Sequence, residues 1–499
     1  MTDPSVAHGD EPKEQKGVVD FVLSLFADVK ANEGVTALIL MVDVFLLLVA
    51  YYLLKTVREP LILASGGVQA KNYATGIQAV VLMGLVPAYA ALTQRLKRMT
   101  LITVTLLFFA SNLLLFWVLA RLQVPGLGGA FFVWLGCFSL VVLAQFWSFA
   151  NDLYTPEQGK RLFAIVGIGG SVGAWVGSKL AEYLTSPASP DSKDPRMSEF
   201  AIMLVSAALL LLCLGLGWMA TLREGGLKKG GAAAEDKPIG GKNGLALIRS
   251  DRYLLLIAAV IMILNLVNTT GESILDLSIL EKVKAATPGW DSLPEEAQEK
   301  AIKAFVGPFR GNFFSWVNLI GAATQMFLVS RIFKYLGIRA ALFSLPLIGV
   351  LVYGGIVAIP LLAFVRIGKI AENSVDYSLY NTTKQALWLP TSREEKYNAK
   401  MTIDSFLVRI GDLVASGLSL GLLALGFGIR TYAAVNLALI AGWLLLAWLI
   451  GRENQARMEE KDAPTSSEAI KKQLKNTVTG DSSAIREAIE KAKREKQKR

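Results

Sequence analysis

Charged side chains interrupt the long apolar runs of this sequence. The run YYLLKTVREPLIL contains Lys55, Arg58 and Glu59, and helical spacing puts Lys55 and Glu59 on one face as an i, i+4 pair. A charge in the middle of a bilayer costs about 2.5 to 3.5 kcal/mol on insertion scales. An ionisable residue in such a run is therefore a candidate for function, although a structural salt bridge or a side chain that reaches the membrane surface would also explain a single one.

Further charges occur in other apolar runs. They are Asp152, Glu272 and, along one stretch, Arg366, Lys369, Glu372, Asp376 and Lys384. Fixed Lys and Arg side chains are the usual way to bind phosphate oxygens, so these cations favour an anionic substrate. The carboxylates would pair with the cations in an empty site or carry a coupling proton. Nearby aromatic side chains would stack on a base or simply pack, and these are Tyr51, Tyr52, Trp147, Phe149, Tyr377 and Tyr380.

Residue types that perform metal or phosphoryl chemistry are scarce. The one histidine is His8, the cysteines Cys137 and Cys213 lie in apolar runs, and the sequence has neither HExxH nor GxxxxGK[ST]. We therefore expect no enzyme, no cofactor and no metal site. The net charge of +10 comes with Lys and Arg placed between the apolar runs and in the C-terminal tail, which favours a membrane protein over a nucleic-acid-binding protein.

The apolar runs are long enough to cross a membrane. Hydrophobic residues make up 53% of the chain and charged residues 18%, and crossing about 30 Å of hydrocarbon takes roughly 20 helical residues. The charged first residues lack the pattern of a signal peptide, so we expect insertion to begin with the first span. Hydropathy predicts about twelve spans: Val35–Val57, Tyr73–Thr93, Leu101–Arg121, Gly129–Asn151, Leu162–Leu184, Phe200–Leu222, Tyr253–Ile274, Asn312–Phe333, Ala340–Ile359, Pro360–Tyr380, Thr402–Leu425 and Tyr432–Ile450.

A polar stretch rich in glycine and lysine divides the chain near its middle and reads as a linker. The predicted segments are a cytoplasmic N-terminal segment (1–34), a six-helix half (35–222), a cytoplasmic linker (223–252), a second six-helix half (253–450) and a charged cytoplasmic tail (451–499). A charged insertion, 280–305, follows the seventh span. We expect it to form short surface helices over one mouth of the protein, and an ordinary loop is the simpler alternative.

Lys and Arg gather after even-numbered spans, as in Arg95, Lys97 and Arg98 after the second span. Because short cytoplasmic loops hold the excess of positive residues, we expect both termini in the cytoplasm. We also expect a multi-pass, monomeric protein of the inner (plasma) membrane. The basic tail would be solvated or would touch anionic lipid head groups.

An internal repeat relates the two predicted halves. LLKTVREPLIL at the end of the first span can be aligned with LVNTTGESILDL in the seventh, which places Glu59 on Glu272. Two repeats of the same orientation, joined by a cytoplasmic linker, are typical of a major-facilitator fold. The predicted fold is therefore an all-α membrane protein in which the first, fourth, seventh and tenth spans surround a central cavity.

The fifth span contains Gly169, Gly173 and Gly177 in GIGGSVGAWVGSK. This spacing has some likeness to a dinucleotide-binding loop, but no strand is predicted before it. A stripe of small residues four apart instead predicts close packing of two helices.

Several runs resemble one known family. YYLLKTVREPLIL, FWSFANDLYTPEQGKRLFAIVGIGGSVGAWVGS, NLVNTTGESIL and YSLYNTTKQALWLPTSREEKYNAKMTIDSF are similar to the ATP/ADP translocase family of plastids and obligate intracellular bacteria. The resemblance covers both halves, 35–450, and implies a major-facilitator-type nucleotide transporter.

The resemblance also assigns candidate substrate-binding residues one at a time. The family's basic residue at the end of the first span falls on Arg58, its glutamate at the end of the fourth span on Asp152, and its lysine after the tenth span on Lys384. The sequence departs from the family in the seventh span, where Asn268 replaces an acidic residue and Glu272 replaces a lysine. These changes alter the charge of the cavity, and Glu272 would then balance Arg58 or Lys384.

Three functions remain open from the sequence. The first is a secondary transporter of nucleotides, acting by ATP/ADP-type exchange or by uptake. The second is a major-facilitator-type transporter of another organic or phosphorylated anion, and the third is a membrane scaffold that transports nothing. The buried charges argue against a scaffold, which would not need them. We expect Lys55 to bind substrate as well, and we assign possible coupling or charge balance to Glu59, Arg366, Lys369, Glu372 and Asp376.

Overall fold

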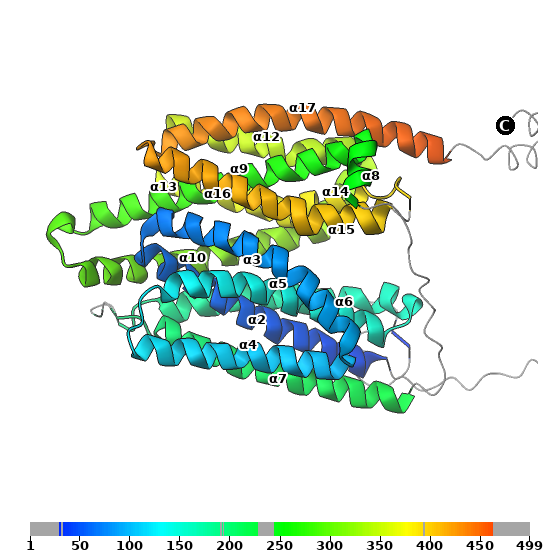
Figure 1. The fold of residues 1–499 in the computed structure, drawn as a ribbon, viewed down its shortest axis with the longest axis horizontal. Coiled ribbons are helices and arrows are strands. Elements are labelled where there is room, and N and C mark those ends of the chain that lie inside the picture. The colour runs from blue at the N-terminus through cyan, green and yellow to red at the C-terminus, as the bar shows by residue number, and fades with distance from the viewer. Residues whose placement is uncertain are drawn as a thin grey trace, which may run out of the picture.

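A computed structural model of the chain describes residues 29–30, 33–189, 192, 194–227, 244–392 and 395–462. Over these ranges the regular structure is helical (Figure 1), apart from an isolated antiparallel β-bridge between Pro187 and Pro195. The long helices before the linker are α2 (Gly34–Ala64), α3 (Gly67–Arg95), α4 (Arg98–Arg121), α5 (Leu127–Leu153), α6 (Pro156–Thr185) and α7 (Glu199–Leu227). Those after it are α9 (Arg252–Ala286), α10 (Glu295–Phe327), α12 (Gly337–Ala358), α13 (Leu362–Val375), α16 (Val408–Ala424) and α17 (Ile429–Asp462).

The helices confirm an all-α membrane protein. Ten helices in the described ranges are long and apolar enough to cross a membrane, and α10 with the short α11 (Val329–Tyr335), bent by 42°, makes an eleventh candidate. The predicted tenth span is less regular. Its helix α13 continues into a π-helical turn at Asp376–Tyr380 and then into α14 (Asn381–Ala386). Such turns are frequent at functional sites.

The charged insertion differs from its prediction. It does not form separate surface helices, because α9 runs on to Ala286 and α10 already begins at Glu295. A single 3₁₀ turn at Trp290–Ser292 joins the two helices into a hairpin. Of the linker, the ends are described: α7 reaches Leu227 and the short α8 occupies Gly244–Ser250. Most of the predicted N-terminal segment, residues 228–243 of the linker and 463–499 of the tail lie outside the described residues.

The helices gather into two groups, one before and one after the linker (Figure 1). One core of buried hydrophobic residues is built from α2 and α4–α7, and a second is built mainly from α9, α10, α12, α13 and α17. We call the end of the bundle with Leu227 and Gly244 the linker end, and the opposite end, where α9 meets α10, the hairpin end. Figure 1 places the far end of α17 at the linker end as well.

The glycine stripe of α6 lies against α2, as its spacing predicted. A side-chain carbon at Gly169 or Gly173 would collide with the carbonyl oxygens of Met41 and Phe45, and one at Gly177 would lie 2.8 Å from the Cα of Val49. Glycine therefore permits the backbones of α2 and α6 to approach closely, which fixes the position of the helix that carries Lys55, Arg58 and Glu59.

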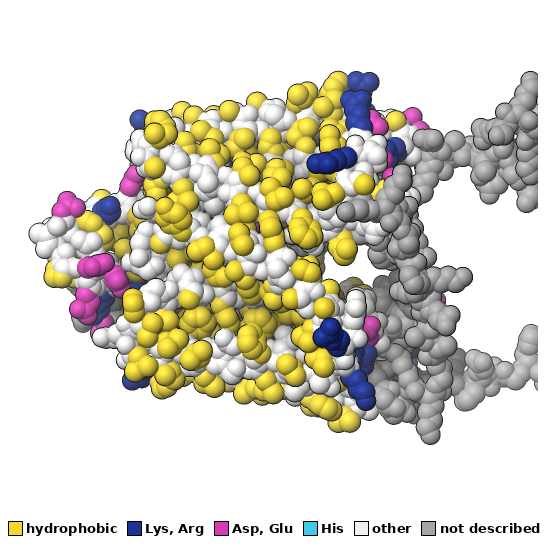
Figure 2. All heavy atoms as spheres, in the orientation of Figure 1, with side chains coloured by type: hydrophobic (Ala, Val, Ile, Leu, Met, Phe, Trp, Pro, Cys, Tyr) yellow, Lys and Arg dark blue, Asp and Glu magenta, His cyan; other side chains and the backbone are white. Residues whose placement is uncertain are grey.

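The surface has the distribution expected of a membrane protein. Hydrophobic side chains cover the flank in Figure 2, whereas charged side chains gather at the two ends. Both signs of charge occur at each end, with several acidic side chains at the hairpin end and clusters of basic side chains at the linker end in this view. The surface is also hollowed at the linker end, between the two groups of helices.

Candidate functional site

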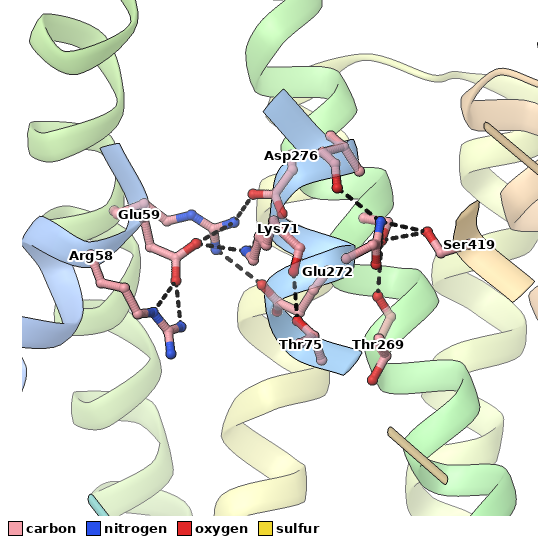
Figure 3. Close-up of polar contacts among 12 residues, drawn as sticks. Arg58, Glu59, Lys71, Thr75, Thr269, Glu272, Asp276 and Ser419 are labelled. Carbon is pink, nitrogen blue, oxygen red and sulfur yellow. Dashed lines mark hydrogen bonds and ion pairs between the residues drawn. The ribbon is translucent and has the colours of Figure 1, made fainter. Parts of the chain in front are cut away.

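A network of ion pairs joins α2 and α3 to α9 and α10 (Figure 3). The Glu59 carboxylate, 1% exposed, accepts hydrogen bonds from Arg58 Nε at 3.0 Å and from Lys71 Nζ at 2.6 Å. Lys71 also donates to Asp276 at 2.7 Å, and Arg310 pairs with Asp276 and lies 3.6 Å from Glu59. The network thus connects helices on the two sides of the linker.

A second part of the network lies between α9, α10 and α13. Glu272 accepts from Arg310 at 3.0 Å and lies 3.7 Å from Lys369. Lys369, which is fully buried, is 3.2 Å from Glu372 and donates to the Asn268 amide oxygen at 3.3 Å. The network as a whole contains four carboxylates and four cations, which are Glu59, Glu272, Asp276 and Glu372 with Arg58, Lys71, Arg310 and Lys369.

A cavity of about 550 Å³ lies against this network, and we call it the central cavity. Its wall comes from α2, α3, α5, α9, α10, α13, α16 and the π-helical turn. Among its lining residues are Lys55, Arg58, Glu59, Asn268 and Glu272. The structure therefore brings together five residues that the sequence singled out on the first and seventh spans.

Lys55 occupies an aromatic cage in this cavity. Its ammonium lies 4.5 Å from the ring centre of Phe314 and 5.2, 5.6 and 5.9 Å from those of Tyr52, Tyr377 and Tyr51. Such rings attract a cation through their negative faces. In the described part of the chain no carboxylate lies within ion-pair distance of Lys55. The expected pair of Lys55 with Glu59 is therefore wrong, because Glu59 faces Lys71 and Arg58 instead.

A larger cavity of about 810 Å³, the linker-end cavity, lies between α2, α5, α6, α10 and the chain from Asp376 to Lys384. Lys384 is 3.7 Å from Asp376 across the π-helical turn, and its side chain is 25% exposed. Trp147 and Tyr52 line the same cavity, and Tyr377 lines both cavities. Tyr377 and the caged Lys55 thus lie at the boundary between the two spaces.

Besides Lys369 and Glu372 of the network, two further candidate residues, Asp152 and Arg366, line neither cavity. Asp152 is 53% exposed and lies 3.8 Å from Arg98, on a separate cavity between α3, α4 and α5. The Arg366 guanidinium bonds the Asn312 amide and lies 5.5 Å from the ring centre of Phe309. The expectation that these residues share the central cavity is therefore wrong. Their positions near the ends of apolar runs suggested the cavity, but neither helix turns them towards it.

The expected partners of Glu272 are also different. Its carboxylate balances Arg310 and Lys369, not Arg58 or Lys384. Arg310, Asp276 and Lys71 were missed by the sequence analysis, and for one shared reason. Each lies just outside a predicted span, since hydropathy ended the seventh span at Ile274 and began the second at Tyr73 and the eighth at Asn312. The charges themselves lower the hydropathy at these positions.

The sequence comparisons point to one family. Residues 131–278 match the model described as TLC ATP/ADP transporter. ADP,ATP carrier protein 1 of Chlamydia pneumoniae is 24% identical over 380 residues, which is 66% of this chain and 69% of that protein. The chloroplastic ADP,ATP carrier protein 1 of Arabidopsis thaliana is 25% identical over 65% of this chain, and the match spans 53% of the plant protein.

Two solved structures with a similar fold are transporters. The nucleoside transporter NupG matches with a TM-score of 0.55 and 13% identity, over 85% of this chain and 99% of NupG. A peptide transporter of the POT family matches with a TM-score of 0.57 and 11% identity, over 83% of this chain and 96% of that protein. At these identities the likeness concerns the fold. Together with the sequence matches, it confirms that this chain resembles the ATP/ADP transporter family and has a major-facilitator-like fold.

Proposed function

We propose that this chain is a secondary transporter that moves nucleotides across a membrane by alternating access. The observation that carries the proposal is the caged Lys55, a cation without a carboxylate partner in the described residues, on the wall of a cavity between the two groups of helices. A free cation binds an anion without first breaking an ion pair. The ADP,ATP carriers to which the chain is similar supply the substrate class.

In this proposal the anionic part of the substrate binds between Lys55 and Lys384. Lys384 needs only to leave Asp376, at 3.7 Å, to reach a phosphate oxygen in the linker-end cavity. Tyr377, Tyr52 and Trp147 offer ring faces on which a base would stack. Charge-assisted hydrogen bonds to the phosphates would supply most of the affinity, since each contributes about 1.5 to 3 kcal/mol.

The two ends of the bundle have different roles in alternating access. The network of Lys71, Asp276 and Arg310 holds α3 against α9 and α10 towards the hairpin end, whereas the surface is hollowed at the linker end (Figure 2). We assign the linker end to the cytoplasm because short cytoplasmic loops carry the excess of Lys and Arg. The conformation described is then inward-open, in a monomer of the inner membrane with both termini in the cytoplasm.

The carboxylates balance the cations of the empty site. An uncompensated buried charge costs several kcal/mol, so each cation of the network keeps at least one carboxylate while no substrate is present. Glu272, whose side chain is 26% exposed, is the network carboxylate most open to the central cavity. An entering phosphate would compete with it for Lys369 and Arg310, which would speed the release of substrate.

A second candidate is the transport of another organic or phosphorylated anion. Asn268 and Glu272, which differ from the residues of the ATP/ADP translocase family at these positions, favour this candidate. Both contact Lys369, so the charge around the cavity would differ from that in the family. A scaffold that transports nothing is the remaining alternative, and it gives no reason for eight charged groups in one buried network.

Uptake into proteoliposomes tests these candidates. The full chain is reconstituted, and uptake of labelled ATP, ADP, other nucleotides and phosphorylated sugars is measured with and without the same compound inside. Saturable uptake of a nucleotide that internal nucleotide accelerates would support the proposal. Uptake of a phosphorylated anion alone would favour the second candidate, and no uptake beyond that of empty vesicles would favour the scaffold.

A further inference from the structure

Asp43 is a buried carboxylate of α2 that takes no part in the ion-pair network. It is 5% exposed and lies nine residues after Gly34, about 14 Å along the helix from its start at the linker end. Among the described residues no Lys or Arg lies within ion-pair distance of it. The four carboxylates of the ion-pair network all have cationic partners, so Asp43, which lies outside the network, requires another explanation.

The Asp43 side chain lines a small pocket with a mainly apolar wall. The pocket has a volume of about 30 Å³, which is sufficient for a water molecule, and lies between α2, α4, α5 and α7. Gln145 of α5 and Cys213 of α7 are its polar neighbours, and the remaining wall is apolar apart from Gly217. Neither α4 nor α5 places a charged group in the pocket. On α6, which packs along α2, Arg161 pairs with Glu33 near the start of α2.

A second cavity lies next to this pocket, towards the linker end. It has a volume of about 330 Å³ and shares Ile102, Gln145 and Phe149 with the pocket of Asp43. Its far wall carries the exposed pair of Arg98 and Asp152. The Gln145 amide therefore separates Asp43 from a space that reaches the surface.

We propose that Asp43 is a proton-binding site that couples proton movement to anion transport. This rests on the transport function proposed above. A lone carboxylate at this depth is costly when ionised and far less costly when protonated. The pocket favours the neutral acid once the proton has entered through the cavity beside Gln145. One proton binds one carboxylate oxygen and later returns to water, and no other bond changes.

The helix α2 provides the link to the anion site. Asp43 and Lys55 lie on the same helix, and the close contact of α2 with the glycines of α6 makes the two helices move as one unit. A movement of α2 that changes the surroundings of Lys55 therefore also changes those of Asp43. Protonation removes the charge that would otherwise resist transfer of this helix segment into a drier environment.

Transport measurements with the full chain separate coupling from exchange. Proteoliposomes containing a pH-sensitive dye take up labelled ADP, first with internal ADP and no pH gradient, then with a pH gradient and no internal ADP. We expect Asp43→Asn to keep the exchange rate within about twofold, and to lose both the acceleration by the pH gradient and the change in dye signal. Asp43→Glu should keep both effects. Asp291→Asn, which changes an exposed carboxylate of the hairpin, should behave as the unchanged protein.

Infrared spectroscopy provides a readout that does not depend on transport. The difference between the spectra of the unchanged protein and of Asp43→Asn should contain a carboxylic acid C=O band that titrates with pH, and the difference between the unchanged protein and Asp291→Asn should lack that band. Coupling that survives in Asp43→Asn would overturn the proposal. So would uptake without internal ADP that no pH gradient accelerates in the unchanged protein. If ADP is not transported at all, the proposed function fails, and the infrared band then decides separately whether Asp43 binds a proton.

Discussion

Lys71 of α3 donates a hydrogen bond to Asp276 of α9 at 2.7 Å and thereby joins the helices before the linker to those after it. Arg310 binds the same carboxylate, so two cations share Asp276 in the buried network. A transporter that opens towards the hairpin end must separate α3 from α9. The Lys71–Asp276 contact must then break in each cycle, which makes it a test of the direction of opening.

We predict that Asp276→Asn opens the hairpin end more often. The change leaves Lys71 and Arg310 with Glu59 as their shared carboxylate, which destabilises the form that is closed at the hairpin end. A loss of about 1.4 kcal/mol in the stability of the closed form would raise the population of the open form tenfold. A cysteine at Ser139, in the central cavity of a chain without its native cysteines, should react faster with an impermeant maleimide added on the hairpin side.

A matched control for this experiment is Asp251→Asn. Asp251 pairs with Arg457 at 2.7 Å, and both residues belong to the helices after the linker. Its loss should leave the labelling rate unchanged. Equal labelling of the Asp276→Asn variant and the unchanged protein would show that the network does not close the hairpin end.

Labelling from outside the cell tests the orientation. Ser292 in the hairpin and Ser250 before α9 are both exposed, at opposite ends of the bundle. A cysteine placed at Ser292 should react with an impermeant reagent in intact cells, and one at Ser250 only after the membrane is opened. The reverse pattern would place the linker and both termini outside.

Lys384→Ala should weaken the binding of an anionic substrate about ten- to a hundred-fold, because a lost charge-assisted hydrogen bond costs about 1.5 to 3 kcal/mol. Lys384→Arg should keep part of the affinity, since the positive charge remains. Equilibrium binding of a labelled nucleotide to purified protein measures both. Lys334→Ala, which removes a cation of α11 that lines neither cavity, is the control. Unchanged binding in Lys384→Ala would remove this residue from the site.

The sequence predicted the spans better than the contacts between them. Hydropathy found α2 and α9 because apolar side chains must face lipid or a core along most of their length. The same measure missed Arg310 and Asp276, because a charge at the end of a run reads as the end of the span. Their burial depends on which helices meet, and a single sequence does not contain that information.

The glycine stripe and the Lys55–Glu59 spacing show which features a single helix determines and which depend on its neighbours. Gly173 needs only a close neighbour, which its place on α6 already implies. The spacing of Lys55 and Glu59 also puts them on one face of α2, but their partners come from other helices. Lys71 reaches Glu59 from α3, while Phe314 and Tyr377 take the place of a carboxylate beside Lys55.

Glu272→Gln should raise the affinity for an anion and lower the rate of transport. Arg310 keeps Asp276 and Lys369 keeps Glu372, so the fold should survive while the cavity gains one net positive charge. The carboxylate that competes with the substrate is then missing, and release slows. Binding and proteoliposome uptake measure the two effects, and Glu281→Gln on the exposed face of α9 is the control. If neither quantity changes, Glu272 has a structural role alone.

The last prediction separates an anion-binding cation from structural ones. Lys55→Met removes a cation that has ring faces but no carboxylate around it, so no buried charge loses its partner. The melting temperature should change little, while nucleotide affinity should fall about ten- to a hundred-fold. Lys55→Arg should retain part of the binding, because a guanidinium also stacks on rings.

Lys369→Met is the contrasting variant. It leaves Glu372 without its cation and Glu272 with Arg310 alone, and loss of one partner of a buried pair costs about 3 to 5 kcal/mol. Its melting temperature should therefore fall clearly, whatever its effect on binding. A thermal unfolding scan and nucleotide binding on the same preparations compare the two lysines. If Lys55→Met instead binds nucleotide as well as the unchanged protein and unfolds early, the aromatic cage is a packing element, and the anion must bind elsewhere in the cavities.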